Sequence, residues 1–263
     1  MSDWQTLDLE REGGVAEIRL NRPDLLNRFD MQLHRELTEL FGALAADPDV
    51  LSVVLSSTGR VFSAGGDTKV MIEAAGNLGH RMAMIDEGRQ LFRAVADFPK
   101  PLIVALTGNS YGLGTSIILL GDAIVTTRTI EFSDPHVHMG LVAGDGGTTA
   151  WPTAMGMIRA KRHLLTGDPM SGEEAWRLGV VTDLVDTVEE IVPAARALAT
   201  RIAKLPPVAV QMTKRALAKA MMARADEVMD LSFYLEALSF GSDDLLEAVA
   251  AFKEKREGVF KGR

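Results

Sequence analysis

The sequence predicts an α/β protein in which parallel strands alternate with helices. Short runs of β-branched and apolar residues recur in the first half of the chain, and helical patterns follow them. This alternation is typical of parallel sheets. From about residue 192 onward every pattern is helical. We therefore expect a boundary near residue 204, which divides the chain into a core at 1–204 and a helical region at 205–263.

The N-terminal elements follow from local spacing. Residues 5–10 and 15–20 flank a Glu12-Gly13-Gly14 turn, which predicts a hairpin. Asp30 is expected to cap a helix, and the apolar positions of that helix are Leu33, Leu37, Phe41 and Leu44. This stripe predicts that His34, which lies between its positions, is exposed. Residues 50–56 read as a buried strand, 59–67 as a glycine-rich loop and 69–97 as mostly helical.

The remaining elements continue the alternation and then end it. We expect strands at 101–106 and 122–127, separated by a turn at 109–112 and a short helix at 113–120. The helical region should contain segments at 194–204, 207–223, 225–238 and 243–255.

Composition excludes several classes of protein. The chain has 263 residues and no cysteine, which rules out disulfides, thiolate metal sites and a cysteine nucleophile. The formal net charge is −8, which argues against a nucleic-acid partner. No run of about 20 apolar residues is present, so we expect no membrane span and a cytoplasmic protein.

Two glycine-rich loops are the first candidates for a site. Gly66 follows the strand at 50–56, and Leu113 lies between Gly112 and Gly114 at the start of the helix after the strand at 101–106. The carboxyl ends of parallel strands meet at one edge of a sheet, so these loops should be neighbours. Two free backbone N–H groups there could stabilise a developing oxyanion. This geometry suggests acyl chemistry.

The residues of these loops resemble the crotonase family, the enoyl-CoA hydratases and isomerases. The resemblance covers nearly the whole chain in the expected order. It is carried by Leu20-Asn21-Arg22-Pro23, Phe62-Ser63-Ala64-Gly65-Gly66-Asp67-Thr68-Lys69, Gly108-Asn109-Ser110-Tyr111-Gly112-Leu113-Gly114, Gly146-Gly147, Leu165-Thr166-Gly167, Ala175 with Leu178-Gly179-Val180-Val181, and Phe252-Lys253-Glu254-Lys255-Arg256.

The resemblance implies a spiral of ββα units with a C-terminal helical region for trimerisation, in a homotrimer or a dimer of trimers. It implies a coenzyme A thioester as substrate, with no other cofactor, and an oxyanion hole made by the N–H groups of Gly66 and Leu113. The further substrate-binding candidates are Arg22, Arg28, Ala64, Gly65, Asp67, Lys69 and Gly112, and Phe252 and Lys255 are expected to reach a neighbouring subunit's ligand.

The acid–base residues depart from the family pattern. The hydratases of this family carry two glutamates, and this sequence has Ser116 and His136 at those positions. Asp145, in a loop that the resemblance places at the acyl pocket, is the remaining candidate base, and His136 is the second candidate. Isomerisation, hydration and hydrolysis all stay open, as does an acyl-CoA binder that has lost catalysis.

Two other interpretations compete. Gly108-Asn109-Ser110-Tyr111-Gly112 matches the nucleophile elbow of α/β-hydrolases, which would make Ser110 a nucleophile. That fold also needs an upstream oxyanion loop that we do not find. His136 and His138 alternate with Val137 and would point to one face of an extended chain. No third or fourth ligand is evident nearby, so we expect no metal site.

Overall fold

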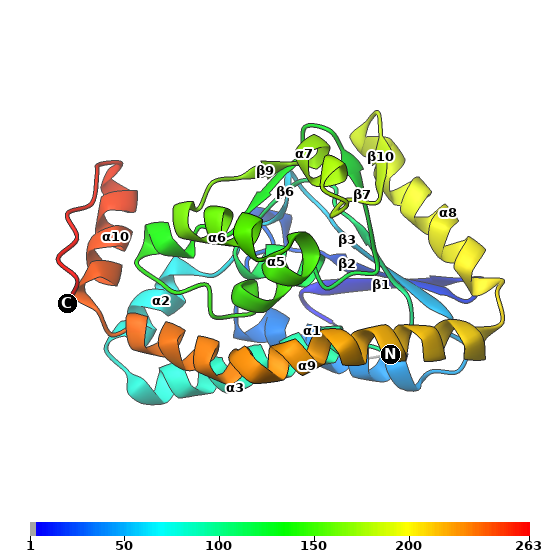
Figure 1. Cartoon of the computed structure of the whole chain (residues 1–263), viewed down its shortest axis with the longest axis horizontal. Helices are drawn as coiled ribbons and strands as arrows, with labels where there is room; N and C mark the ends of the chain where they lie inside the picture. The colour runs from blue at the N-terminus through cyan, green and yellow to red at the C-terminus, as the bar shows by residue number, and fades with distance from the viewer. Residues whose placement is uncertain (1–3) are drawn as a thin grey trace.

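The computed structural model describes residues 4–263 and contains two sheets with helices around them (Figure 1). The large sheet has the order β1-β2-β3-β5-β7-β10, and every pair in it is parallel except β1 with β2. Its strands are β1 (Leu7–Glu12), β2 (Val15–Leu20), β3 (Ser52–Ser57), β5 (Leu102–Ala105), β7 (Ala123–Thr127) and β10 (Asp183–Val185). The predicted α/β class with parallel pairing is confirmed.

The second sheet explains how the chain coils. It has the order β4-β6-β8-β9 and consists of β4 (Val61–Ser63), β6 (Asn109–Tyr111), β8 (Glu131–Ser133) and β9 (Met170–Ser171). Each of β3, β5 and β7 adds to the large sheet, and the strand that follows it adds to the small one before a helix begins. The chain thus repeats ββα units as a spiral. The turn expected at 109–112 is therefore mostly strand.

The helices fall close to their expected positions. The predicted N-cap is confirmed, because the Asp30 side chain accepts a hydrogen bond from the backbone N–H of Leu33. The helices of the first two thirds are α1 (Met31–Ala46), α2 (Thr68–Ala75), α3 (Leu78–Ala96), α4 (Leu113–Ile118), α5 (Gly147–Met155), α6 (Met157–Thr166) and α7 (Gly172–Arg177). Short 3-10 turns are η1 (Pro23–Leu25), η2 (His136–Met139) and η3 (Val188–Glu190).

The C-terminal helices are α8 (Ile191–Ala203), α9 (Pro207–Ser239) and α10 (Asp243–Glu254). The expected break between 223 and 225 is wrong, since α9 runs as one 33-residue helix through Arg224. Nothing in that stretch interrupts a helix, whereas Pro206 and Pro207 separate α9 from α8. In Figure 1 α9 runs along one side of the molecule, with α10 beyond its end.

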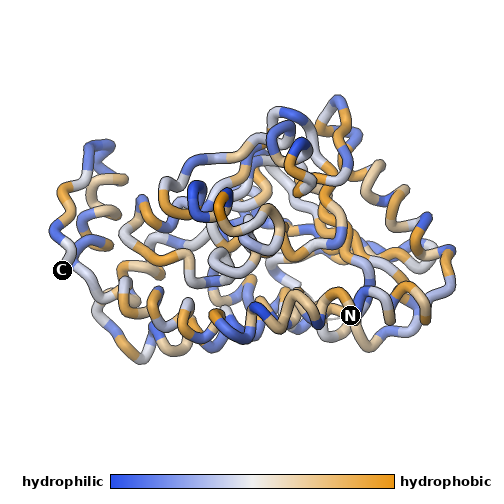
Figure 2. The backbone as a smooth tube through the Cα atoms, viewed as in Figure 1, coloured by the Kyte–Doolittle hydropathy of each residue, from blue (hydrophilic) through white to orange (hydrophobic). Residues whose placement is uncertain are grey.

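The core is continuous across the proposed boundary at 204. The four predicted stripe residues of α1 are all buried, as are the strands β3 and β5. Figure 2 shows hydrophobic residues gathered along the strands of the large sheet. Met229 and Phe233 of α9 belong to the same buried cluster, and α9 packs against α3 and α5. The helical region therefore closes the core, while its role in oligomerisation stays a prediction.

The hairpin at the start of the chain shows why its glycines are needed. Glu12 pairs with Val15, so Gly13 and Gly14 form a two-residue turn. Their φ angles are 56° and 83°. A two-residue hairpin turn of this kind requires positive φ at both central positions, which glycine adopts without steric cost.

Candidate active site

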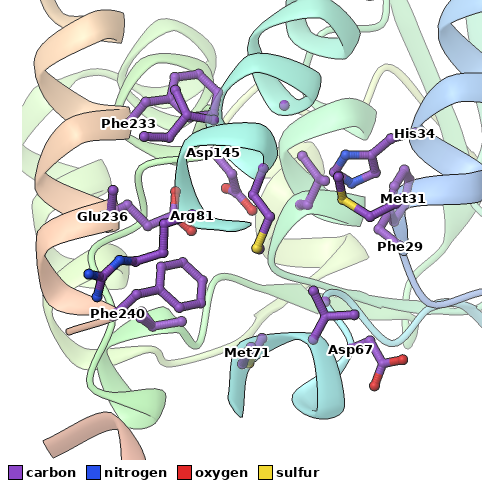
Figure 3. A pocket seen from close by; sticks show the side chains of 18 of the residues that line it. Phe29, Met31, His34, Asp67, Met71, Arg81, Asp145, Phe233, Glu236 and Phe240 are labelled. Carbon is purple, nitrogen blue, oxygen red and sulfur yellow. The ribbon is translucent and has the colours of Figure 1, made fainter. Parts of the chain in front are cut away.

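A pocket of about 690 Å³, its open mouth included, brings the four catalytic candidates together. Six regions line it: the start of α1, the segment from β4 into α2, the middle of α3, the start of α4, the segment 136–145, and the C-terminal end of α9. Gly66, Leu113, His136 and Asp145 all lie on its wall. In Figure 3 Asp145 lies between two sets of side chains. Those from α3 and the end of α9 include Arg81 and Glu236, and those from the start of α1 include Met31 and His34.

The two glycine-rich loops are in contact. Gly65 has a φ of 79°, and a Cβ placed on it would lie 2.9 Å from the carbonyl oxygen of Tyr111. Gly112, with a φ of 54°, turns the chain from β6 into α4, so that Leu113 is the first residue of that helix. The N–H groups of a first helical turn have no intrahelical acceptor. The Gly66 and Leu113 amides therefore border one pocket.

These two N–H groups are available. In residues 4–263, neither Gly66 nor Leu113 donates its N–H to a backbone carbonyl outside the regular elements. The neighbouring amides are occupied, because Ala64 donates to Leu26 and Gly112 donates to Ser133. The two amides expected from the sequence are thus among those that the loops leave free.

His136 lies between two carboxylates. Its Nδ1 is in hydrogen-bond contact with Asp134, and its Nε2 lies 3.3 Å from Oδ2 of Asp145. The expected extended conformation of 136–138 is wrong: these residues form η2, which directs His138 away to the carbonyl of Thr166. Proline before the turn and glycine after it allow this tight conformation.

Asp134 is the part of this cluster that the sequence analysis missed. Its side chain is fully buried, and one of its oxygens would lie 2.3 Å from a Cβ placed on Gly147, the first residue of α5. A carboxylate beside the N-terminus of a helix is stabilised by the helix dipole. The small residue at 147 therefore makes room for an anion that holds His136. The Ser-Asp-Pro sequence before His136 was a local signal for it.

Glu236 of α9 also faces this cluster, and the sequence analysis missed it as well. Its Oε1 lies 3.9 Å from Nε2 of His136. The signal was its spacing, since Met229, Ser232, Phe233 and Glu236 form one buried helical stripe. A glutamate in such a stripe is rarely buried without a partner or a function. Gly144 leaves the space for it: a Cβ there would lie 2.4 Å from Cβ of Glu236.

The cluster separates the charges of its members. Burial lowers the pKa of His136, but the charges of Asp134 and Asp145 and hydrogen bonds to both outweigh it, so the pKa stands well above 6.5. Burial and then the charge of Asp145 raise the pKa of Glu236 well above 4.5, although His136 opposes this. The two shifts therefore favour the charged form of His136 and the protonated form of Glu236.

A metal ion fits this arrangement poorly. Ligand atoms of Asp134, His136 and Asp145 lie within 4.8 Å of one another. The two carboxylates contact opposite nitrogens of the same ring, however, and one ion can coordinate only one of those nitrogens. The arrangement is that of an ion-paired histidine.

Ser116 and Ser110 lie outside the pocket. Ser116, at one glutamate position of the hydratases, is fully buried in α4 and is not on the pocket wall. Ser110 is fully buried in β6, and within the described residues its hydroxyl has no hydrogen-bond partner. A nucleophile must reach its substrate, so the α/β-hydrolase alternative is wrong for this fold.

Of the charged binding candidates on the N-terminal loops, Asp67 lines the pocket, whereas Arg22, Arg28 and Lys69 do not. Arg22 pairs with Asp30 at 2.6 Å and donates to the carbonyl of Arg28, which commits its guanidinium to the loop before α1. The guanidinium of Arg28 lies 3.2 Å from Asp67, whose carboxylate caps α2 and lines the pocket. Lys69 is exposed on α2.

Phe252 and Lys255 lie at the far end of the chain. Phe252 is 69% exposed on α10, and Lys255 follows the last helical residue with a φ of 54°. The expectation that both lie on the helix holds for Phe252 alone. A contact of either residue with a neighbouring subunit stays a prediction.

His34 differs most from the sequence-based expectation. We predicted an exposed side chain, but His34 lines the pocket one helical turn after Met31. Its ring lies 5.8 Å from that of Phe29, centroid to centroid. Burial lowers the pKa of His34 to about 4, so the imidazole is neutral. Helix α1 buries its leucines in the core. The adjoining face of the helix, which carries Met31 and His34, lines the pocket rather than facing solvent.

Comparison with known proteins agrees with this architecture. The family model for enoyl-CoA hydratase/isomerase matches residues 10–263. A short-chain-enoyl-CoA hydratase of Clostridium acetobutylicum is 33% identical over 260 residues, which cover 97% of each chain. The 1,2-epoxyphenylacetyl-CoA isomerase of Escherichia coli is 32% identical, over 96% of this chain and 97% of its own.

Solved structures agree as well. The crystal structure of an enoyl-CoA hydratase/isomerase from Mycobacterium paratuberculosis superposes with a TM-score of 0.89 at 34% identity, over 94% of this chain and 99% of that one. In residues 4–263, no helix is long and apolar enough to cross a membrane. Matching sequence, fold and spiral topology together establish that this chain belongs to the enoyl-CoA hydratase/isomerase family.

Proposed function

We propose that this protein is an enoyl-CoA isomerase that moves a carbon–carbon double bond toward the thioester, with Asp145 as the base. One observation carries the proposal. Asp145 has a buried oxygen, Oδ1, without a partner among the described side and main chains, and it lines the pocket that Gly66 and Leu113 border. A base and two oxyanion donors on one pocket are what enolate chemistry requires.

The proposed reaction is a proton shift through an enolate. Asp145 removes a proton from C2 of a 3-enoyl thioester, so that the C2–H bond breaks and negative charge collects on the thioester oxygen. The N–H groups of Gly66 and Leu113 stabilise that charge. The same carboxyl then returns the proton to C4, and the double bond shifts from C3–C4 to C2–C3. No cofactor beyond the coenzyme A of the substrate takes part.

The charged histidine supports this role for Asp145. The imidazole, whose charged form is favoured, lies 3.3 Å from the Asp145 carboxylate, whose side chain is only 14% exposed. Asp134 on the opposite nitrogen keeps the imidazole charged. Asp145 is thus the carboxylate that pairs with the imidazole, whereas burial and the charge of Asp145 raise the pKa of Glu236 well above its ordinary value.

Hydration is the second candidate, and Glu236 favours it. Addition of water to a 2-enoyl thioester needs a base for the water and an acid for C2, and the pair Asp145 and Glu236 offers both. Hydrolysis of the thioester ranks third, because no feature of the pocket favours it over isomerisation or hydration.

Incubation with 3-hexenoyl-CoA and with 2-hexenoyl-CoA, each in D2O, tests the proposal. Isomerisation should convert the first into the second. Deuterium should appear at C2 and C4 only to the extent that the base does not return the original proton. Formation of 3-hydroxyhexanoyl-CoA from the second would favour hydration. If neither thioester changes, the protein is an acyl-CoA binder without this catalysis.

The oligomeric state and location are further parts of the proposal. We infer a homotrimer or a dimer of trimers in the cytoplasm. The support for the oligomer is an apolar outer surface on the C-terminal helices. Val208, Leu217, Leu231 and Leu238 of α9 are 61–74% exposed. Such residues on a long helix are typical of an interface. Sedimentation equilibrium should give a mass of three or six chains.

A further inference from the structure

The start of α1 gives the pocket a polar group that proton transfer does not use. Met31 and His34 lie three residues apart on α1, so both side chains point to the same side of the helix and both line the pocket. Figure 3 shows His34 beside Met31 and Phe29, across Asp145 from Glu236. His34 thus lines the same pocket as Asp145 and faces the space that an acyl group would enter.

This histidine lacks a hydrogen-bond partner in the free protein. Its Nδ1 is buried, and no other group in residues 4–263 bonds to it. Most buried polar atoms in native proteins are satisfied, and an unsatisfied one is costly unless a ligand or ordered water completes it. Asp134 performs that role for His136, but no carboxylate performs it for His34.

The surroundings restrict the group that could complete it. Phe29 packs on the ring, and methionine and phenylalanine side chains form much of the adjoining wall. The low pKa of about 4 leaves the imidazole neutral at physiological pH, with one donor and one acceptor nitrogen. A neutral ring in an apolar wall suits an uncharged oxygen better than a carboxylate.

We propose that His34 is a specificity residue that hydrogen-bonds an oxygen on the acyl chain, so that the preferred substrates are thioesters of hydroxy or oxo acids. This inference rests on the proposed function, because it assumes that the acyl group enters this pocket. A plain alkyl chain would exclude water from the ring and leave its nitrogen unsatisfied. An acyl group with a keto or hydroxyl oxygen would satisfy it.

Binding of saturated thioesters tests this without turnover. Calorimetry would compare hexanoyl-CoA with its 3-oxo, 4-oxo and 5-oxo derivatives, which differ only in the place of one oxygen. We expect at least one ketone to bind about tenfold more tightly than hexanoyl-CoA, as loss of one buried hydrogen bond predicts. Equal or weaker binding of all three ketones would overturn the inference.

Three variants assign the preference to the ring. His34→Phe keeps a planar side chain and should remove the preference, while His34→Gln should restore part of it. Glu39→Gln, on the exposed face of the same helix, is the matched control and should bind like the parent. A preference that persists in His34→Phe would contradict the inference. If none of the four thioesters binds the parent, the proposed function itself fails and this inference with it.

Discussion

Replacing Asp145 with asparagine removes the proposed base and keeps the shape of the side chain. The carboxylate lies 3.3 Å from Nε2 of His136, a separation at which opposite charges attract by roughly 5 kcal/mol in a medium of effective dielectric about 20. Desolvation of both groups offsets most of that attraction. His136 also keeps Asp134 on its other nitrogen. We therefore expect Asp145→Asn to fold with little loss of stability.

Catalysis should respond far more strongly. A positioned general base contributes about 10²–10⁴-fold in rate, so kcat for 3-hexenoyl-CoA should fall by that factor. KM should change little, because the oxyanion donors and the pocket walls stay. The pKa of Glu236 should fall toward its ordinary value, since the charge of Asp145 is one cause of its rise.

The assay is the formation of 2-hexenoyl-CoA under substrate saturation, with Asp134→Asn as the matched control. Asp134 contacts the same ring from the far side and does not line the pocket. Its loss should destabilise the fold and reduce kcat less than loss of Asp145 does. If Asp145→Asn keeps more than a tenth of the parent kcat, the base lies elsewhere and the reasoning from Asp145 is refuted.

Three further predictions concern the oxyanion donors and the protonation states. Leu113→Pro removes one N–H at the first helical position, where proline is tolerated, and should lower kcat by about 10²–10³-fold, whereas Leu113→Ala keeps the N–H and should lose much less; equal rates for the two variants would exclude the amide. Glu236→Gln should be more stable against urea than the parent, by a margin that grows as pH rises above 4.5. The pKa of Glu236 is raised in the folded state, so its contribution to stability is complete below 4.5 and is lost as pH rises toward the folded pKa. Glutamine does not titrate and avoids that loss. A pH-independent difference between the two proteins would contradict a raised pKa. Gly147→Ala places a Cβ 2.3 Å from Asp134 and should displace that carboxylate, so the pKa of His136 measured by NMR should fall toward 6.5; an unchanged titration would show that Asp134 does not hold the ring.

The sequence was informative where a function depends on the backbone. The expected strand at 50–56 and the buried stripe of α1 agree with β3 and with the core. Gly66 and Leu113 border one pocket because parallel strands end at one sheet edge, a consequence of topology alone. Local patterns suffice for such features, since a glycine-rich turn after a strand constrains its own geometry.

Side chains that meet from distant elements could not be placed in this way. Glu236 lies 91 positions after Asp145, and only the packing of α9 over the segment 136–145 brings them together. Periodicity assigned His34 to solvent because it considers one helix alone, while α3 covers that face of α1. For Glu236 the available signal was its place in a buried stripe of α9. That signal predicts burial of the glutamate but does not identify the residues it contacts.

The exchange of two glutamates for Ser116 and His136 need not abolish acid–base chemistry, because the pocket acquires carboxyls from other elements. Burial by itself would lower the pKa of a histidine at position 136, but the charges of Asp134 and Asp145 and hydrogen bonds to both raise it well above 6.5. Asp145 pairs with this imidazole through Nε2, on the side of the ring that faces the pocket. Burial and then the charge of Asp145 raise the pKa of Glu236 well above 4.5, which favours its protonated form. Two carboxyls in opposite protonation states are the general requirement for an acid and a base at one pH. Asp134 is therefore a positioning residue, which holds His136 and its charge beside Asp145.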